Sequence, residues 1–213
     1  MIKSIKPFGT GAFLLEWDQI ISDEIQDEIS FYLSKIEDKS IKGIVDVVAG
    51  YASITIFFQP ELIKSKEIEG IIYSNHISSK SDASDHIWEI PVKYSSSSEK
   101  DMKVLMDHTG LSRGEIVNIH HATYYKVCFL GFLPGFLYLS GLDTKLHIPR
   151  KAVPDLNISK GSVAIGGQQT GIYPQNSPGG WYIIGQTDFR LINFYQPPYC
   201  KIKTGDIIRF TIA

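Results

Sequence analysis

The sequence predicts an α+β protein of two domains, a small α+β domain over residues 1–80 and a mainly β domain over residues 86–213. Three observations predict this class. A helical stripe of apolar residues lies among β-branched runs near the N-terminus, small and charged residues at 78–85 are typical of a linker, and no helical period remains after Tyr124. A length of 213 residues allows one large domain or two small ones.

The first part of the chain predicts a strand followed by a helix. Residues 11–17 (GAFLLEW) are an apolar run typical of a strand. Within residues 23–36, apolar side chains recur at i, i+4, i+8 and i+11, which is the stripe of an amphipathic helix, and Ser22 stands before its first turn.

The next segment predicts a hairpin and a second helix. Two β-branched runs, 44–49 and 52–58, are separated by two turn residues, and a weaker helical pattern follows Pro60. The order β-α-β-β-α becomes a ferredoxin-like split βαβ unit if another strand closes it. The apolar run 86–94 either supplies that strand or begins the second domain.

Two short helices are expected before the β region. Ser98-x-x-Asp101 and Ser112-x-x-Glu115 each match the capping-box spacing, in which a side chain and a backbone amide satisfy one another at a helix N-terminus. Gly110 suits the left-handed conformation that ends a helix. Short apolar runs between Gly, Pro, Asn and Asp then predict a β-barrel or sandwich. These runs are 124–130, 162–166, 181–187, 190–195 and 206–212.

Composition excludes several classes of protein. Lys and Arg number 21 against 23 Asp and Glu, and the net charge of −2 argues against a broad electrostatic grip on nucleic acid or an anionic membrane. Cys128 and Cys200 match no metal-ligand or disulfide spacing. The N-terminus has no signal-peptide h-region and the most apolar run, 128–142, is too short for a membrane span, so we expect a cytoplasmic protein.

Turn residues crowd into one stretch that holds two candidate binding segments. Ten of the 18 glycines and five of the ten prolines lie in 131–190. In the first segment, 129–139, aromatic residues alternate with Gly and Pro, which let a backbone approach a ligand closely; core packing of a strand, a turn and a strand is the alternative. In the second, 161–181, the amides of Gly166 and Gly167 could form an anion-binding nest or simply a hairpin turn. Neither complete nucleotide-binding glycine motif is present.

Two basic groups are candidates for catalysis. His120 has an ordinary pKa near 6.5 and could transfer a proton, whereas a hydrogen-bonding role inside the fold is the alternative. His120 and His121 point about 100° apart on a helix, so they do not share a metal ion easily, and we expect no metal site. Arg150 follows a proline and could grip a carboxylate or phosphate through two hydrogen bonds; a surface ion pair is the alternative.

These segments, in this order, resemble the KipI family, also called allophanate hydrolase subunit 1 or the B subunit of 5-oxoprolinase. The resemblance covers nearly the whole chain. It rests on residues 129–139, 149–150, 161–174 and 177–187, with 11–17, 50–56, 90–94, 108–112 and His120 in matching places upstream. It implies a cyclophilin-like β-barrel after the small N-terminal domain. Gly166 departs from the pattern, in which alanine is common at this position.

The resemblance also implies an activity and partners. The family forms a complex with a KipA-like protein, the C subunit, and with a LamB/YcsF-like protein, the A subunit, and this complex uses ATP to open 5-oxoproline to glutamate. The chain would then have no activity of its own. One member instead inhibits a sporulation histidine kinase, so a regulatory protein that blocks autophosphorylation of a sensor histidine kinase is the alternative. A carboxyltransferase component is a weaker third possibility, because related modules are fused in urea carboxylase.

Matched residue by residue, the family pattern implies where the site lies. We expect His120 to transfer a proton, and Arg150 with the Gly166 and Gly167 amides to stabilise anionic oxygens. The implied substrate- or ligand-binding residues are Phe132, Pro134, Gly135, Phe136, Gly166, Gly167, Gln169, Tyr173, Pro178, Gly179, Gly180 and Trp181.

Overall fold

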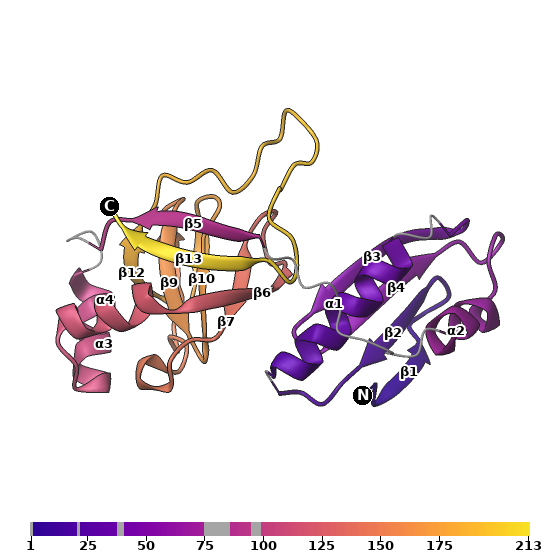
Figure 1. Ribbon diagram of the computed structural model, residues 1–213, viewed down its shortest axis with the longest axis horizontal. Coiled ribbons are helices and arrows are strands. Elements are labelled where there is room, and N and C mark those ends of the chain that lie inside the picture. The colour runs from indigo at the N-terminus through magenta and orange to yellow at the C-terminus, as the bar shows by residue number, and fades with distance from the viewer. Residues whose placement is uncertain (1, 21, 38–40, 75–85, 95–98) are drawn as a thin grey trace. The chain divides into compact units, whose positions relative to one another are not determined.

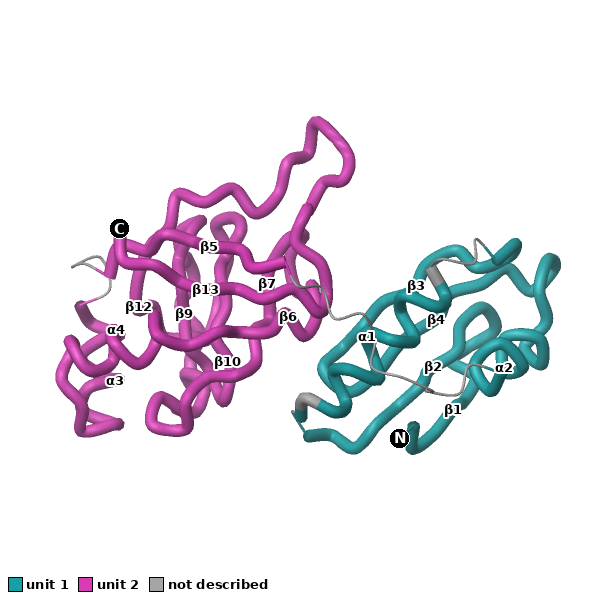
Figure 2. Tube along the Cα trace, viewed as in Figure 1, with its two compact units in different colours: residues 1–83 teal, residues 84–213 magenta. Residues whose placement is uncertain are grey.

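The computed structural model describes residues 2–20, 22–37, 41–74, 86–94 and 99–213. The chain divides into two compact units, residues 1–83 and 84–213 (Figure 2). This division falls between the ranges predicted for the two domains. The expected linker, 78–85, lies outside the described residues.

The first unit is a four-stranded antiparallel sheet with two helices (Figure 1). Its elements are β1 (Ser4–Pro7), β2 (Ala12–Glu16), α1 (Asp23–Glu37), β3 (Ile44–Gly50), β4 (Ser53–Phe58) and α2 (Ser65–Tyr73). The strand order is β1-β2-β4-β3. Both helices and the sheet share one core, in which Leu15, Ile29, Ile56 and Ile68 are at most 1% exposed.

The predicted helix over 23–36 and the predicted hairpin are confirmed, and the strand that completes this sheet is β1. It precedes β2 in the chain instead of following α2, so the connectivity is ββαββα. The sequence does not predict β1, because four residues that include a lysine and a proline carry no strand pattern. The second helix begins at Ser65 and not directly after Pro60. At its start the Lys64 amide donates to Glu67 Oε1 at 3.1 Å, which is one of the two hydrogen bonds of a capping box; the Lys64 side chain supplies no acceptor for the other.

The second unit contains a seven-stranded sheet and two helices. Its elements are β5 (Ile87–Val92), α3 (Glu99–Thr109), α4 (Arg113–Ala122), β6 (Tyr124–Leu130), β7 (Leu137–Ser140), the 3₁₀ turn η2 (Thr144–Leu146), β8 (Asp155–Ile158), β9 (Ser162–Gly166), β10 (Gln169–Ile172), β11 (Ser177–Gly179), β12 (Tyr182–Gln186) and β13 (Ile207–Ile212). The sheet order is β12-β9-β10-β7-β6-β13-β5, and β8 pairs separately with β11.

The seven-stranded sheet curls into a nearly closed barrel. A bridge of two backbone hydrogen bonds between Lys93 and Gln186 joins the end of β5 to β12, the other edge strand. The barrel interior is apolar, and α3 and α4 lie together at one end of the sheet (Figure 1). Their side chains Met102, Leu105 and Ile116 are fully buried in the barrel core.

The local signals at the two helices are confirmed where the structure describes them. The Ser112 amide donates to Glu115 Oε2 at 2.8 Å, and the Glu115 amide donates back to Ser112 Oγ at 3.3 Å. Gly110 has φ +71° and donates to the Met106 carbonyl at 2.9 Å, as a helix C-cap does. Ser98 lies outside the described residues.

The strand pairing decides two predictions about strands. The run 86–94 belongs to the second unit, because β5 runs parallel to β13. The prediction of a strand at 190–195 is wrong. These residues lie in the long connection between β12 and β13, which extends away from the sheet (Figure 1) and contains only the bridge between Ile192 and Cys200. None of the helices in the described part of the chain is long and apolar enough to cross a membrane.

Candidate functional site

Aromatic side chains form a layer on the outer face of the barrel. Leu137 and Leu139 of β7 point into the barrel core, so Tyr138 between them points outward. Tyr138 packs 5.6 Å from Trp181, and both rings contact Phe136, at 4.8 Å and 5.5 Å between centroids. We call this layer the aromatic cluster; its members are Phe132, Phe136, Tyr138, Tyr173 and Trp181.

Glycines around the cluster leave the room that these rings occupy. A Cβ at Gly166 would lie 2.5 Å from the Trp181 ring, and a Cβ at Gly171 would lie 2.5 Å from the Leu137 carbonyl oxygen. A Cβ at Gly179 would overlap the hydroxyl of Tyr173. Part of the glycine crowding in 131–190 therefore follows from close packing of aromatic rings.

Phe132 stands at the edge of this cluster in an unusual conformation. Its φ is +66°, which a bulky non-glycine residue rarely adopts, and its side chain is 59% exposed. The ring packs edge-to-face on Phe136 at 5.6 Å. Strained backbone of this kind concentrates at functional sites, because the surrounding structure must hold it in place.

Arg150 lies over the cluster. Its guanidinium carbon is 5.4 Å from the Trp181 ring, within the range of a cation–π interaction. Within the residues that the structure describes, no carboxylate pairs with Arg150, so the alternative of a surface ion pair finds no support there. The guanidinium keeps hydrogen-bond donors for an anionic ligand.

The neighbouring residue fixes the backbone that carries Arg150. Lys151 Nζ donates to Asp101 at 2.7 Å and also pairs with Asp155, and its amide donates to the Gly180 carbonyl at 2.8 Å. Burial lowers the pKa of Lys151, but the two carboxylates raise it more. Asp101 also accepts from the Ile183 amide at 2.8 Å. The charged lysine therefore ties this segment to α3 and β8.

Gln169 places a second polar group on the same face. It is 6% exposed, and its Nε2 amide has no acceptor among the described residues. Its cross-strand partner is Gly166, which lies against the Trp181 ring, and directly opposed residues of a β-pair project to the same side. A buried donor without an acceptor is costly in free energy, and surrounding atoms cover Gln169 Nε2 in the free chain.

The tyrosines of the cluster are neutral. Burial raises the pKa of Tyr173 to about 12, opposed in part by a hydrogen bond with the Trp181 backbone and by the charge of Arg150. Burial also raises the pKa of Tyr138, again opposed by Arg150. Near neutral pH both hydroxyls keep their protons and can donate hydrogen bonds.

His120 lies elsewhere, inside the barrel. It is fully buried and stacks on Phe210 at 4.7 Å. Its Nδ1 is 2.8 Å from the Tyr94 hydroxyl and its Nε2 is 2.9 Å from Thr170 Oγ1. The Thr170 hydroxyl donates to the Ala164 carbonyl, so we assign the proton to Nε2, and the Tyr94 hydroxyl then donates to Nδ1. Burial and then the charge of His121 lower the pKa of His120 to about 3. This geometry supports the alternative of a hydrogen-bonding histidine.

The structure does not gather all the candidate residues in one place. Gly167 turns the β9–β10 hairpin with φ +65°, and its amide donates to the Ile148 carbonyl at 2.7 Å, so it is not free for an oxyanion. Gly135, with φ +79°, belongs to the β6–β7 turn. The residues brought together are Phe132, Phe136, Arg150, Gly166, Gln169, Tyr173, Gly179 and Trp181, with Pro134, Gly135, Pro178 and Gly180 in the flanking turns and strands.

Sequence reasoning missed two parts of this site, the place of Tyr138 in the cluster and the pairing of Lys151 with Asp101. Tyr138 was visible as part of the aromatic segment, whereas the pairing of Lys151 with Asp101 had no local signal, since 50 residues separate them. Among the described residues, no three His, Cys, Asp or Glu side chains gather into a group that could hold a metal ion.

The chain has a mixed α/β fold that it shares with carboxyltransferase domains. At 18% identity the crystal structure of the Kluyveromyces lactis urea amidolyase matches the whole chain with a TM-score of 0.77, over 16% of that larger protein, and shows this fold alone. The family model for the carboxyltransferase domain, subdomain C and D, matches residues 3–202, and the chain belongs to this family.

Individual proteins that resemble the chain carry more specific names than the family model does. The chain is 35% identical to the B subunit of 5-oxoprolinase from Escherichia coli O157:H7, over 95% of this chain and 92% of that protein. It is 30% identical to the B subunit of 5-oxoprolinase from Bacillus subtilis strain 168, over 97% and 91%. The crystal structure of TTHA0988 matches 96% of the chain at 26% identity and a TM-score of 0.85, and the chain spans 40% of its length.

Proposed function

We propose that this chain is a non-autonomous subunit of an ATP-dependent 5-oxoprolinase, which converts 5-oxo-L-proline, ATP and water to L-glutamate, ADP and phosphate. Its partners in this proposal are a KipA-like C subunit and a LamB/YcsF-like A subunit. A cytoplasmic location and a cyclophilin-like class for the barrel belong to the same proposal. The names of the relatives support it, and so does the chemistry of the aromatic cluster.

One observation carries the role of this chain: among the described residues, an arginine without a carboxylate partner and a buried amide without an acceptor lie beside the same aromatic cluster. Arg150 stacks on Trp181, and Gln169 faces the same side. 5-Oxoproline offers a carboxylate, a lactam carbonyl and a flat five-membered ring. The guanidinium would bind the carboxylate. The Gln169 amide and the Trp181 indole, 6% and 4% exposed in the free chain, would have to open to the ligand before they meet its carbonyl oxygen and its ring.

The proposed catalytic roles of Arg150 and His120 differ in part from those expected from the sequence. A lactam is a stable amide, and phosphorylation of its carbonyl oxygen by ATP would prepare it for attack by water. Arg150 remains the candidate for stabilising anionic oxygens. His120 has both ring nitrogens hydrogen-bonded inside the barrel, so proton transfer to the substrate falls to groups on the partner proteins or to the cluster hydroxyls.

The test is ATP-dependent glutamate formation from 5-oxoproline by the co-expressed proteins of the complex, with each one omitted in turn. We expect no activity without this chain. Arg150→Ala should lower kcat/KM for 5-oxoproline by roughly 10- to 150-fold, the worth of a hydrogen bond to a charged group. Arg150→Lys should recover part of this loss, because it keeps the charge without the two-pronged geometry.

A matched control is Arg209→Ala, because Arg209 also stacks on an aromatic ring, 5.6 Å from Tyr124, on another part of the barrel. It should leave kcat/KM unchanged. Gln169→Leu should reduce 5-oxoproline binding without destabilising the free chain, since it removes an unpaired buried donor. Turnover that persists without the chain, or an Arg150→Ala complex as active as the wild type, would contradict the proposal.

A further inference from the structure

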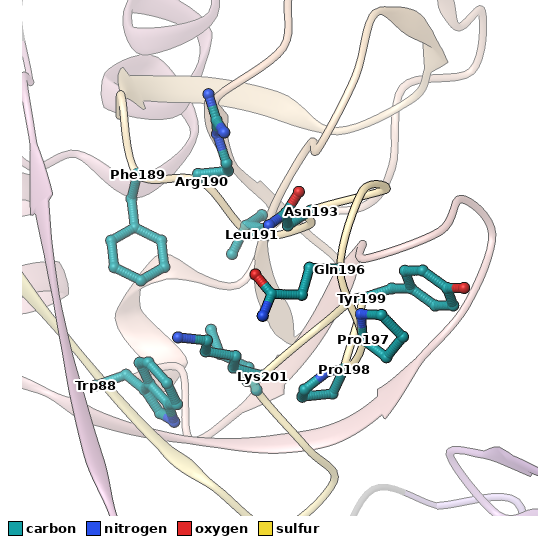
Figure 3. Close-up of a pocket in the computed structure, with 11 residues that line it drawn as sticks. Trp88, Phe189, Arg190, Leu191, Asn193, Gln196, Pro197, Pro198, Tyr199 and Lys201 are labelled. Carbon is teal, nitrogen blue, oxygen red and sulfur yellow. The ribbon is translucent and has the colours of Figure 1, made fainter.

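A cavity lies between the barrel and the long β12–β13 connection. Its volume is about 460 Å³, within the range of small-molecule sites, and it is separate from the aromatic cluster. Figure 3 shows residues of this connection around it, with Trp88 of β5 on one side. Its lining residues are Trp88, Phe189, Arg190, Leu191, Asn193, Gln196, Pro197, Pro198, Tyr199, Lys201 and Ile202.

The aromatic wall of this cavity is held rigidly. Trp88 Nε1 donates to Asp206 at 2.9 Å, and Asp206 also accepts from the Lys203 amide at 2.9 Å. Phe189 packs edge-to-face against the Trp88 ring at 6.4 Å. The fixed indole provides a face on which a planar ring can stack, whereas the Phe189 ring lies at 78° to the indole and would meet that ring edge-on.

The polar groups of the cavity are cationic or neutral. Arg190 and Lys201 line it, and neither pairs with a carboxylate in the part of the chain that the structure describes. The described lining includes no Asp or Glu. Figure 3 shows the side chains of Lys201 and Gln196 directed into the space between Phe189, Trp88 and Pro198, whereas the Arg190 guanidinium points away from this space.

We infer that this cavity binds a nucleoside phosphate. The base would stack on the Trp88 ring and meet Phe189 edge-to-face, with the Gln196 amide able to hydrogen-bond its edge. The phosphates would pair with the Lys201 ammonium group. The choice of ATP among such ligands rests on the proposed function; the combination of a planar ring and an anion rests on the cavity alone.

The test is calorimetric titration of the full chain with ATP, adenosine and inorganic tripolyphosphate. ATP should bind, and the other two should bind at least about tenfold more weakly, because each offers only one half of the ligand. Lys201→Met should weaken ATP binding by about tenfold or more. Phe189→Leu should weaken ATP and adenosine binding but not tripolyphosphate binding. Lys203→Met removes an exposed lysine two positions away that does not line the cavity, and should change nothing.

Several results would overturn the inference. The inference fails if ATP does not bind, or if tripolyphosphate or adenosine binds as tightly as ATP. It also fails if the Lys201→Met chain binds ATP as tightly as the wild type, or if Arg150→Met, and not Lys201→Met, abolishes ATP binding. These outcomes are independent of turnover. A chain that supports 5-oxoproline hydrolysis without binding ATP in this cavity would refute only the nucleotide site, and a chain that binds ATP but supports no hydrolysis would refute only the proposed function.

Discussion

At the scale of single residues, the partners of a side chain decide its role. His120 and Arg150 are the two basic candidates in the sequence, yet one is fully buried with both ring nitrogens hydrogen-bonded and the other lies over an indole without a carboxylate among the described residues. Burial removes the charge of the histidine, whereas the guanidinium stays charged at any relevant pH. Of the two, only Arg150 can meet an anionic substrate as a cation.

The buried His120 makes stability depend on pH in a defined direction. Its pKa is about 3 in the folded chain and near 6.5 when unfolded, so between these values the unfolded state binds more protons. The contribution of His120 to the free energy of unfolding should therefore be fully present above pH 6.5. As the pH falls below 6.5, the free energy of unfolding should decrease by up to about 1.4 kcal/mol per pH unit. Urea unfolding at several pH values between about 7.5 and 4.5 measures this slope.

Two variants isolate the contribution of this one ring. His120→Asn should lose part of the slope, because the group that is kept neutral by burial is gone. His121→Gln should retain the slope. In proton–nitrogen spectra the His120 ring should also stay in one neutral form down to about pH 5. Equal slopes for the two variants, or a protonated His120 at that pH, would contradict this prediction.

At the scale of elements, an ion cluster holds the segment before β8 against α3. Lys151 and Asp101 side chains are 11% and 9% exposed, and both Lys151 and the Ile183 amide donate to Asp101. This segment carries Arg150, and the cluster therefore fixes the position of the candidate substrate-binding group over Trp181. Lys151 is in this sense a positioning residue.

Removing Lys151 should lower the stability of the fold, because the buried carboxylate of Asp101 is left without its charged partner. We expect Lys151→Met to lower the free energy of unfolding by about 3–5 kcal/mol. In the reconstituted complex it should raise KM for 5-oxoproline, while Arg150 itself is unchanged. The matched control is Lys93→Met, because the pair of Lys93 with Asp188 is largely exposed and should contribute at most about 1 kcal/mol. A Lys151→Met chain as stable as Lys93→Met would refute the role of the cluster.

At the scale of the whole molecule, each unit has its own apolar core. The first core joins both helices to the four-stranded sheet, and the second fills the barrel. Units that have separate apolar cores can unfold in separate thermal transitions. We expect the predicted domains to unfold as two transitions in calorimetry of the full chain.

Core truncations assign the two transitions. Ile56→Ala should shift only the transition of residues 1–83, and Val127→Ala only that of residues 84–213, each by the equivalent of about 2–5 kcal/mol for the isoleucine and somewhat less for the smaller valine. A single transition that both substitutions shift equally would show that the two units unfold together.

Much of the fold could be predicted because its signals are local. The stripe over 23–36 sets one face of α1, and the Ser112–Glu115 pair sets the start of α4, since each depends on residues within a few positions. Strands of three or four residues, such as β1, β8, β10 and β11, carry too little pattern to be recognised. They exist because a neighbouring strand provides their hydrogen bonds.

The sequence by itself determined the mixed α/β class with a barrel-like sheet, the family resemblance and most of the residues that form the aromatic cluster. Only the tertiary structure decided which of them act together. Arg150 and Trp181 meet because the barrel brings residues 31 positions apart into contact, and Lys151 is held by Asp101, 50 positions away. The tertiary structure also placed His120 in the barrel interior. Burial and unpaired hydrogen-bond donors are properties of packed surroundings, and no short stretch of sequence contains them.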